Sequence, residues 1–333
     1  MRKTAFFVVL FFLWGLLPAR AASLQIEAPG GMKSGQDDAI SAYGLPGKPL
    51  RAVLEDYEVR AQALFYNIRR REATFSGEVV LQVQEEKTRT TLRAEKLVLT
   101  LGAQTARAEG RVDLAFEEEG LYLEAAAVEA DLRRETYVLV GRPAVARFRE
   151  SHRFAARRLV YDRKATRLTV EEEVVWEMTC QAGKRTLTAT RGEYDRTRGL
   201  LELMEVTAAE KDLRLQAGRL VYEEETERFH LTENPRLAQG DERSLTAASI
   251  AWEPAKELYY ASGEVTFRDP VYTGTAHEAF YEPAAKRLLL RGEARLARGE
   301  DFVLGAEILY DFGAGRLRVD GGAKARILLA EET

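Results

Sequence analysis

Hydrophobic positions along this chain follow a repeating unit of two parts. The first part is a short motif with an apolar residue, a small residue two positions later, and then an aliphatic and an aromatic residue three and five positions after the small one. The second part, for example 77–83 and 265–267, alternates apolar and polar residues with the period of two that is typical of half-buried strands. Polar stretches with turn composition, such as 162–167, separate the parts. Each unit therefore predicts a two-stranded β-hairpin.

The motif occurs nine times, at intervals of 28 to 33 residues. Its small residue, which we call the anchor, is one of Ala61, Ala94, Ala125, Ala156, Ala189, Ala217, Ala247, Ala276 and Gly305. The aromatic position five residues later holds Tyr66, Leu99, Ala130, Tyr161, Tyr194, Tyr222, Trp252, Tyr281 and Tyr310. Self-similarity at a fixed period is typical of repeat folds, so we expect about nine bent hairpins.

Apolar positions before the anchor and after it have opposite parity, so a straight strand would point them to opposite faces. The simplest explanation is a bulge or corner just after the anchor that carries the strand from one sheet onto another, and a small anchor fits where two sheets converge. The alternative is a short turn between two separate strands. Either way we expect two facing sheets, although helix propensity alone would favour a helix at 125–132.

The N-terminus has the organisation of a secretory signal peptide over residues 1–21. Arg2 and Lys3 precede an apolar run of about 13 residues, and Ala19–Ala21 forms a small-residue cleavage site. The run is shorter than the roughly 20 residues that a membrane-spanning helix needs. We therefore expect a cleaved signal and an exported protein, with an uncleaved inner-membrane anchor as the alternative.

Two further segments follow the signal peptide. Residues 22–50 are rich in glycine and proline and show no periodicity, so we expect a flexible, loop-like leader. Residues 51–333 contain all nine copies of the motif and are expected to form one repeat domain.

Composition narrows the choice of function. The chain has 333 residues, of which 46% are hydrophobic and 31% charged, as expected for a soluble folded protein. Its formal net charge of −4 argues against a nucleic-acid partner. Cys180 is the only cysteine and the three histidines lie far apart, so we expect no metal, no cofactor and no catalytic residue. Glutamate runs such as 117–119 are typical of solvated turns, which disfavours a carbohydrate-active enzyme.

The repeated unit resembles the lipopolysaccharide-transport bridge proteins of the LptA/OstA-like family, also called organic solvent tolerance proteins. Residues 154–162 (FAARRLVYD) and 187–195 (LTATRGEYD), with arms such as 262–267, carry the resemblance, which covers roughly residues 57–330. It implies an all-β, elongated repeat β-jellyroll in the periplasm, folded like an open V of two sheets. It also implies an apolar interior that holds acyl chains of lipopolysaccharide or a similar lipid, and no enzymatic activity.

The candidate lipid-groove residues are those that the motif places on the inner faces of the two sheets. They are Leu92, Ala94, Leu97, Leu159, Tyr161, Leu187, Ala189, Tyr194, Leu215, Ala217, Leu220, Tyr222, Leu245, Ala247, Ile250, Trp252, Tyr281, Ile308 and Tyr310. Four positions depart from the family pattern, namely Gly192 and Ala279 at the aliphatic position and Leu99 and Ala130 at the aromatic one. The alternative is an exported structural or adhesive scaffold whose inward side chains form a dry core.

The ends of the repeat stack are candidate partner sites. An open stack cannot close on itself, so we expect unpaired edges near Tyr57–Tyr66 and near Leu317–Leu329. The stretch 326–330 is apolar and free of proline. We therefore expect strand addition, which includes head-to-tail association with a second copy. The resemblance adds homologous jellyroll domains of inner- and outer-membrane transport components as partners.

Overall fold

The computed structural model describes residues 7–9, 24–35, 38–54, 57–85, 88–148, 151–180, 183–210, 213–240 and 242–326. The chain divides into two compact units, unit 1 (Met1–Val170) and unit 2 (Glu171–Thr333). Both units consist almost entirely of antiparallel strands, which confirms the predicted all-β class of stacked hairpins. Among the described residues no helix is long and apolar enough to cross a membrane.

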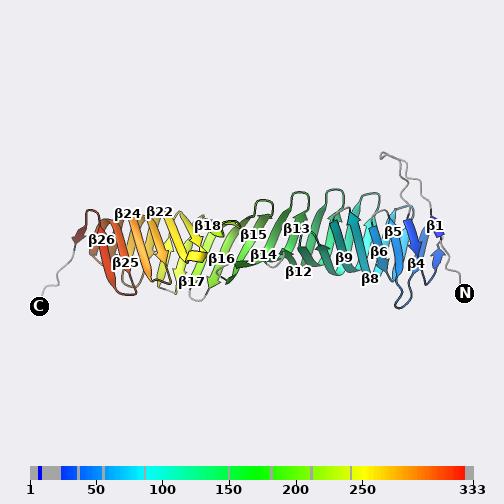
Figure 1. Cartoon of the computed structure of the whole chain (residues 1–333), viewed down its shortest axis with the longest axis horizontal. Helices are drawn as coiled ribbons and strands as arrows, with labels where there is room; N and C mark the ends of the chain where they lie inside the picture. The colour runs from blue at the N-terminus through cyan, green and yellow to red at the C-terminus, as the bar shows by residue number, and fades with distance from the viewer. Residues whose placement is uncertain are drawn as a thin grey trace. The chain divides into compact units, whose positions relative to one another are not determined.

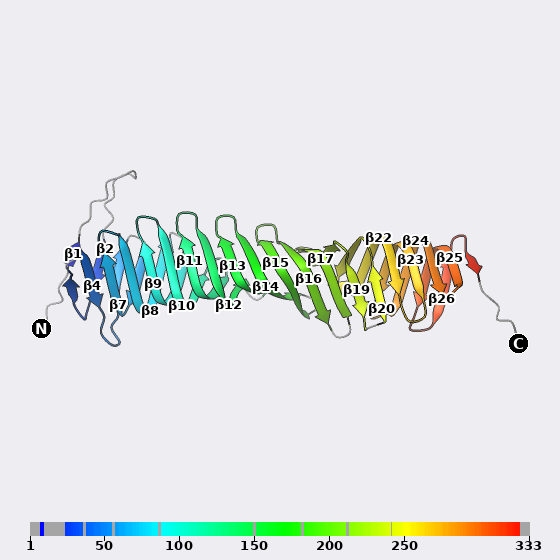
Figure 2. The ribbon, with the colours of Figure 1, turned by 180° about the vertical axis from the view of Figure 1, so that it is seen from behind.

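Unit 1 is a stack of antiparallel strands in which β9 to β12 each pair with the strand before and the strand after (Figures 1 and 2). Its strands are β1 (Phe7–Val9), β2 (Leu24–Glu27), β3 (Met32–Ser34), β4 (Ala39–Tyr43), β5 (Leu50–Leu54), β6 (Tyr57–Ala61), β7 (Ala63–Asn67), β8 (Glu72–Glu85), β9 (Thr88–Thr100), β10 (Thr105–Phe116), β11 (Leu121–Asp131), β12 (Thr136–Phe148), β13 (His152–Asp162) and the start of β14 (Arg167–Cys180).

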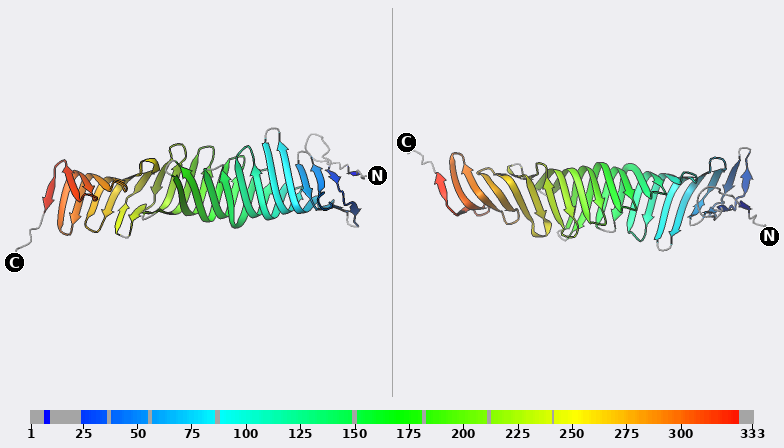
Figure 3. Two further views of the ribbon diagram at one scale, coloured as in Figure 1. Left: turned by 60° about the horizontal axis from the view of Figure 1, so that its bottom comes forward. Right: turned by 90° about the horizontal axis from the view of Figure 1, so that it is seen from above.

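Unit 2 has the same alternation of motif strand and returning strand, and Figure 3 shows it from two further sides in green to red. After the end of β14 its elements are β15 (Gly183–Asp195), β16 (Leu200–Glu210), β17 (Leu213–Glu223), β18 (Arg228–Thr232), β19 (Arg236–Gln239), β20 (Arg243–Thr246), β21 (Ser249–Glu253), the short 3₁₀ helix η1 (Pro254–Lys256), β22 (Leu258–Arg268), β23 (Thr273–Glu282), β24 (Arg287–Arg298), β25 (Asp301–Asp311), β26 (Arg316–Asp320) and β27 (Lys324–Arg326).

Motif strands change the face that they bury just after the anchor, as predicted. In β9, Leu92 and the anchor Ala94 are buried, the next two residues are both exposed, and Leu97 begins the second buried series. Most motif strands run through this change without interruption, but the first repeat breaks at Gln62 and the seventh at 247–248. Both sequence-based alternatives, a corner and a short break, therefore occur in this chain.

The extra residue of the bulge lies in the returning strand, whereas the sequence analysis placed the irregularity in the motif strand. Between β8 and β9 the register passes from Ser76 opposite Lys96 to Val79 opposite Ala94, so two residues of β8 face one residue of β9. Those two residues, Gly77 and Glu78, have φ values of 78° and 49°. Gly-Glu pairs at 263–264 and 292–293 repeat this left-handed conformation. The extra residue bends the returning strand, and the motif strand follows that bend.

Glycine is needed at the bulge because the residue after the anchor of the preceding motif strand presses against it. A Cβ added to Gly263 would lie 2.8 Å from the Cβ of Ala248. In β17 the two roles are exchanged, because Gly218 follows the anchor and Glu233 occupies the bulge with a φ of 60°. A Cβ added to Gly218 would lie 2.7 Å from the Cβ of Glu233. In both pairs, one of the two residues must lack a Cβ.

The prediction of a loop-like leader at residues 22–50 is wrong for most of that segment. It contains β2, β3 and β4, and the stack begins there because β2 pairs with β5 and β4 pairs with β7. These strands are too short to show a period, and their prolines and glycines lie in turns such as 45–48. The predicted signal peptide lies outside the described residues apart from Phe7–Val9, so its cleavage stays a prediction.

The expected first edge of the stack is also misplaced. β6 pairs with both β5 and β8, and β7 pairs with both β4 and β8, so Tyr57–Tyr66 is enclosed on both sides. At the other end, within the part of the chain that the structure describes, β26 and β27 pair with β25 alone. The apolar stretch after Arg326 lies outside the described residues.

Candidate functional site

The predicted groove residues lie inside their units. In unit 1, all five are buried, and in unit 2 all are buried except Ala247, which is half-buried. They come from both halves of the bent motif strands, so the bend brings two series of side chains to one interior. This burial fits a lipid groove and a dry core equally well, and the distinction depends on how the interior is filled and closed.

Two rims border the interior in each unit. We call the turns before the motif strands, such as 117–120, the start rim, and the turns after them, such as 163–166, the end rim. Since each motif strand bends at its anchor, its two ends reach opposite rims. Contacts between the rims therefore close the mouth of the interior.

Three tyrosines of the repeated aromatic position connect the rims. The hydroxyls of Tyr161 and Tyr281 donate hydrogen bonds to a carboxylate and a carboxamide on the start rim, and the Tyr281 hydroxyl lies 2.6 Å from its acceptor. Both acceptors lie 42 residues before their tyrosine, which is more than one repeat back. The third, Tyr310, interacts electrostatically with the start-rim carboxylate of Asp269. We call these contacts the tyrosine latches: Tyr161 with Glu119, Tyr281 with Gln239, and Tyr310 with Asp269.

The latch residues are held in place by their surroundings. Burial, and then the charge of Asp269, raises the pKa of Tyr310 to about 12, so this hydroxyl stays protonated at neutral pH. At the unit 1 latch the Arg163 Nε donates to the Glu119 carboxylate at 2.7 Å, and its guanidinium lies 5.3 Å from the Phe116 ring centroid. A charged hydrogen bond of this kind is stronger than a neutral one.

A continuous series of aromatic rings fills much of the interior of unit 2. Successive ring centroids lie 4.5 to 6.4 Å apart, within the range of favourable aromatic pairs. We call this series the aromatic ladder: Trp176, Tyr222, Phe229, Trp252, Tyr259, Tyr281 and Phe312. Three of its members are predicted groove residues, so packing between rings is one role of the repeated aromatic position.

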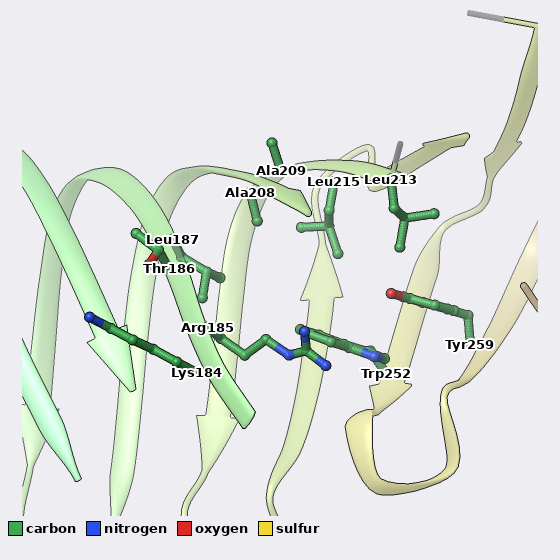
Figure 4. Close-up of a pocket in the computed structure, with 10 residues that line it drawn as sticks. All are labelled: Lys184, Arg185, Thr186, Leu187, Ala208, Ala209, Leu213, Leu215, Trp252 and Tyr259. Carbon is green, nitrogen blue, oxygen red and sulfur yellow. The ribbon is translucent and has the colours of Figure 1, made fainter. Parts of the chain in front are cut away.

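Beside the ladder, unit 2 has a cavity of about 150 Å³ (Figure 4). Leu187 and Leu215 form part of its apolar wall, and Lys184 and Arg185 approach from the start of β15. The Arg185 guanidinium lies 5.6 Å from the Trp252 ring centroid, and the Lys184 ammonium pairs with Glu177 at 3.0 Å. The cavity therefore combines an apolar wall with cationic groups, which suits an anionic amphiphile.

Unit 1 has an interior cavity of about 90 Å³ beside Ala130, one of the two residues at the aromatic position that are not aromatic. Ala106 pairs with Leu99 on one side and with Ala130 on the other, and these are the two departures from the motif. The wall of the cavity is small or aliphatic: Leu92, Ala106, Ala108, Leu114, Val128 and Ala130. Glu135 and Arg163 stand among its polar lining residues.

The remaining candidate residues behave as ordinary surface or core positions. His277 is exposed, as expected for a residue just after an anchor, and lies 3.7 Å from Glu293. Ala279, one of the departures at the aliphatic position, is fully buried. Within the described ranges, no cluster of three or more His, Cys, Asp or Glu side chains could hold a metal ion.

The sequence analysis missed the latches and the unit 1 cavity. The sequence signal that could have revealed the latches is an acidic or amide side chain on the start rim, about 42 residues before a motif tyrosine. The departures at Leu99 and Ala130 were noticed, but only their pairing with the same β10 residue shows that they lie together.

Comparison with known proteins finds a family similar to part of the chain. Residues 58–167 match a family described as "LptA/(LptD N-terminal domain) LPS transport protein", and this range lies within unit 1. Among solved structures the chain is similar to LptH, the LptA-homologous periplasmic component of the lipopolysaccharide transport device from Pseudomonas aeruginosa. That similarity has 13% sequence identity and a TM-score of 0.33, over 35% of this chain and 95% of LptH. No curated protein matches the chain.

Proposed function

We propose that this protein carries lipid across the periplasm, because residues 58–167 match a family of lipopolysaccharide transport proteins. Its interior shields the acyl chains of lipopolysaccharide or a similar lipid during transport to the outer membrane. The protein acts without enzymatic chemistry and is exported by a cleaved signal peptide.

The observation that carries this proposal is the interior of unit 1. Inward side chains from both halves of β9, β10 and β11 are apolar, and they leave a cavity between them. Each methylene that moves from water into such an environment contributes about 0.8 kcal/mol. A groove that takes even part of an acyl chain therefore lowers the cost of moving lipid through water.

Partners would join the protein through strand addition at its C-terminal edge. β26 and β27 offer unpaired backbone groups on the side away from β25, within the described residues. A second copy of this chain or a homologous jellyroll domain of a membrane-anchored component could add a strand there. Aligned interiors would then form one path for lipid.

A structural scaffold with a dry core is the second candidate, and the aromatic ladder of unit 2 favours it for that unit. Rings packed at 4.5 to 6.4 Å leave little space between them. The ladder is therefore the feature that a carrier hypothesis must explain, and the two candidates make opposite predictions for lipid contact.

Site-specific photo-crosslinking to lipopolysaccharide tests the carrier proposal. A benzophenone amino acid replaces Leu97, which is fully buried, or Val140, which is 51% exposed. We expect crosslinks at Leu97 well above those at Val140, with circular dichroism confirming that both variants fold. Equal or absent crosslinking at both positions in folded protein would favour the scaffold.

A further inference from the structure

We propose that acyl chains enter unit 1 sideways, through a window in its mouth at Ala130, where a cavity lies beside β11 and the motif supplies no latching side chain. The tyrosine latches tie the rims together at Tyr161 in unit 1 and at Tyr281 and Tyr310 in unit 2. This inference rests on the proposed carrier function and adds where the lipid enters.

The unit 1 latch closes the mouth of the interior with charged hydrogen bonds. The Tyr161 hydroxyl and the Arg163 Nε both donate to the carboxylate of Glu119, so one acidic group on the start rim holds two groups on the end rim. Arg163 also lies 3.5 Å from Glu135 and its side chain is only 13% exposed. An alkyl chain that passed between the rims here would have to separate charged hydrogen bonds and could offer none in return.

The two residues that replace an aromatic residue in the motif, Leu99 and Ala130, cannot form such a contact. Leucine and alanine have no hydroxyl, so neither Leu99 nor Ala130 can donate to the opposite rim. The alanine also removes the bulk of an aromatic ring, and the cavity lies beside it. Ala106 and Ala108 face the same space, so three alanines on adjacent strands keep it open.

The volume of the unit 1 cavity limits which part of a ligand it can hold. A volume of about 90 Å³ is below the roughly 300–1,000 Å³ of a pocket for a drug-sized ligand. The cavity therefore holds the end of one alkyl chain, and further entry requires the rims to separate. Separation needs no latch to break at Leu99 and Ala130. Because Arg163 is already bonded to Glu119, the window selects an apolar chain and not an anionic headgroup.

The test is a fluorescence titration of the mature full-length protein with 11-(dansylamino)undecanoic acid, an alkyl chain that carries a reporter. The variant Ala130→Tyr restores the aromatic side chain and fills the space, and we expect its affinity for the probe to fall at least tenfold. Ala130→Ser is the matched control, since it adds a hydroxyl without the ring, and it should bind within twofold of the unchanged protein. Ala108→Phe, which fills the cavity from the neighbouring strand β10, is a second closing variant in case Ala130→Tyr does not fold.

Lipopolysaccharide crosslinking locates the entry point without closing it. A benzophenone amino acid at Val128, which lines the window, should crosslink at least fivefold more than one at Leu168, a fully buried unit 1 residue that does not line the cavity. Equal crosslinking at the two positions, or unchanged probe affinity in folded Ala130→Tyr and Ala108→Phe, would overturn the window while leaving the carrier intact. No probe binding and no crosslinking in the unchanged protein would instead remove the carrier function, and the window with it.

Discussion

Unit 1 and unit 2 use the same bent hairpin but fill it differently. In unit 2 the aromatic ladder packs ring against ring from Trp176 to Phe312. In unit 1, the middle of the stack is lined by leucines and alanines, and aromatic contacts gather around Phe116, Tyr137 and Tyr161. The repeat thus fixes the backbone, while the residue at the aromatic position decides whether rings or aliphatic side chains line the interior.

This difference suggests that the aromatic ladder of unit 2 mainly contributes to stability, whereas the cavity of unit 1 mainly serves lipid binding. Aromatic side chains bury large areas and their pairing adds energy, so the ladder favours a rigid core. A cavity between small side chains forgoes such contacts and leaves room for a ligand. The positions that contribute least to the core of unit 1 are therefore the ones expected to matter most for lipid.

The largest expected effect comes from breaking the ladder. Phe229 is fully buried and its ring contacts three other members, so Phe229→Ala should lower the free energy of unfolding by about 3–5 kcal/mol. Urea denaturation measures this loss. Ala108→Gly at the unit 1 cavity is the counterpart and should cost about 1 kcal/mol. Similar losses for both variants would contradict the proposed division between the units.

A somewhat smaller effect is expected where both units share the bulge. Gly263→Ala places a Cβ against Ala248 and puts alanine at a φ of 76°, so we expect a loss of about 2–3 kcal/mol. Adding Ala248→Gly should restore part of that loss, because the natural pair Gly218 and Glu233 has this reversed arrangement. Thermal unfolding of the single and double variants measures the recovery, and additive losses would show that the close approach is not the cause.

The tyrosine latches of the two units differ in their hydrogen-bond acceptors. Tyr161→Phe removes a hydrogen bond to a carboxylate and should cost about 1.5–3 kcal/mol, whereas Tyr281→Phe removes one to the Gln239 amide and should cost about 0.5–1.5 kcal/mol. Chemical denaturation of the two variants gives the difference. The opposite order would mean that the charged acceptor does not strengthen the unit 1 latch.

Alkaline pH should weaken the unit 2 latch at Tyr310. The pKa of this hydroxyl is raised from 10.0 to about 12 in the folded protein, so its contribution to stability is complete below pH 10 and is lost as the pH rises through 12. The unfolding free energy of the unchanged protein should therefore fall more steeply between pH 10 and 12 than that of Tyr310→Phe. Parallel curves for the two proteins would remove the latch from that pH dependence.

The smallest effect is expected at the cation beside the unit 2 cavity. Arg185→Gln should cost about 0.5–1 kcal/mol through loss of its contact with Trp252. Lys184→Gln is the matched control, because its ion pair with Glu177 is exposed, and it should change stability by less than about 0.5 kcal/mol. The fluorescence spectrum of Trp252, isolated by Trp176→Phe, should shift in the first variant and not in the second.

Sequence periodicity was sufficient to predict the hairpins, the anchors and the inward series of side chains. The change of face after Ala94 follows directly from the parity of Leu92 and Leu97, because a straight strand would point these two side chains to opposite faces. The position of the bulge could not follow from the motif, because the extra residue lies in the returning strand. The Gly-Glu pairs at 77–78 and 263–264 marked that place, but their meaning depends on which strand they face.

Long-range pairing limited the rest of the prediction. β2 and β4 have few residues each, so their membership of the stack is decided by partners in β5 and β7 and not by any local pattern. The latches depend on side chains about 42 residues apart whose contact requires the bend and the offset between rims. Neither the bend nor the offset between the rims can be read from the sequence of a single repeat.

The bulge also bears on how such a chain can grow or shrink in evolution. Each bulge residue fits against the strand beside it, as Gly263 does against Ala248, so a hairpin carries its own bend with it. Duplication or loss of a whole hairpin preserves every neighbouring fit, and intervals of 28 to 33 residues show that turns absorb small insertions. A single inserted residue inside a strand would instead invert its inner and outer faces. Lineages of this fold should therefore change length in steps of one hairpin.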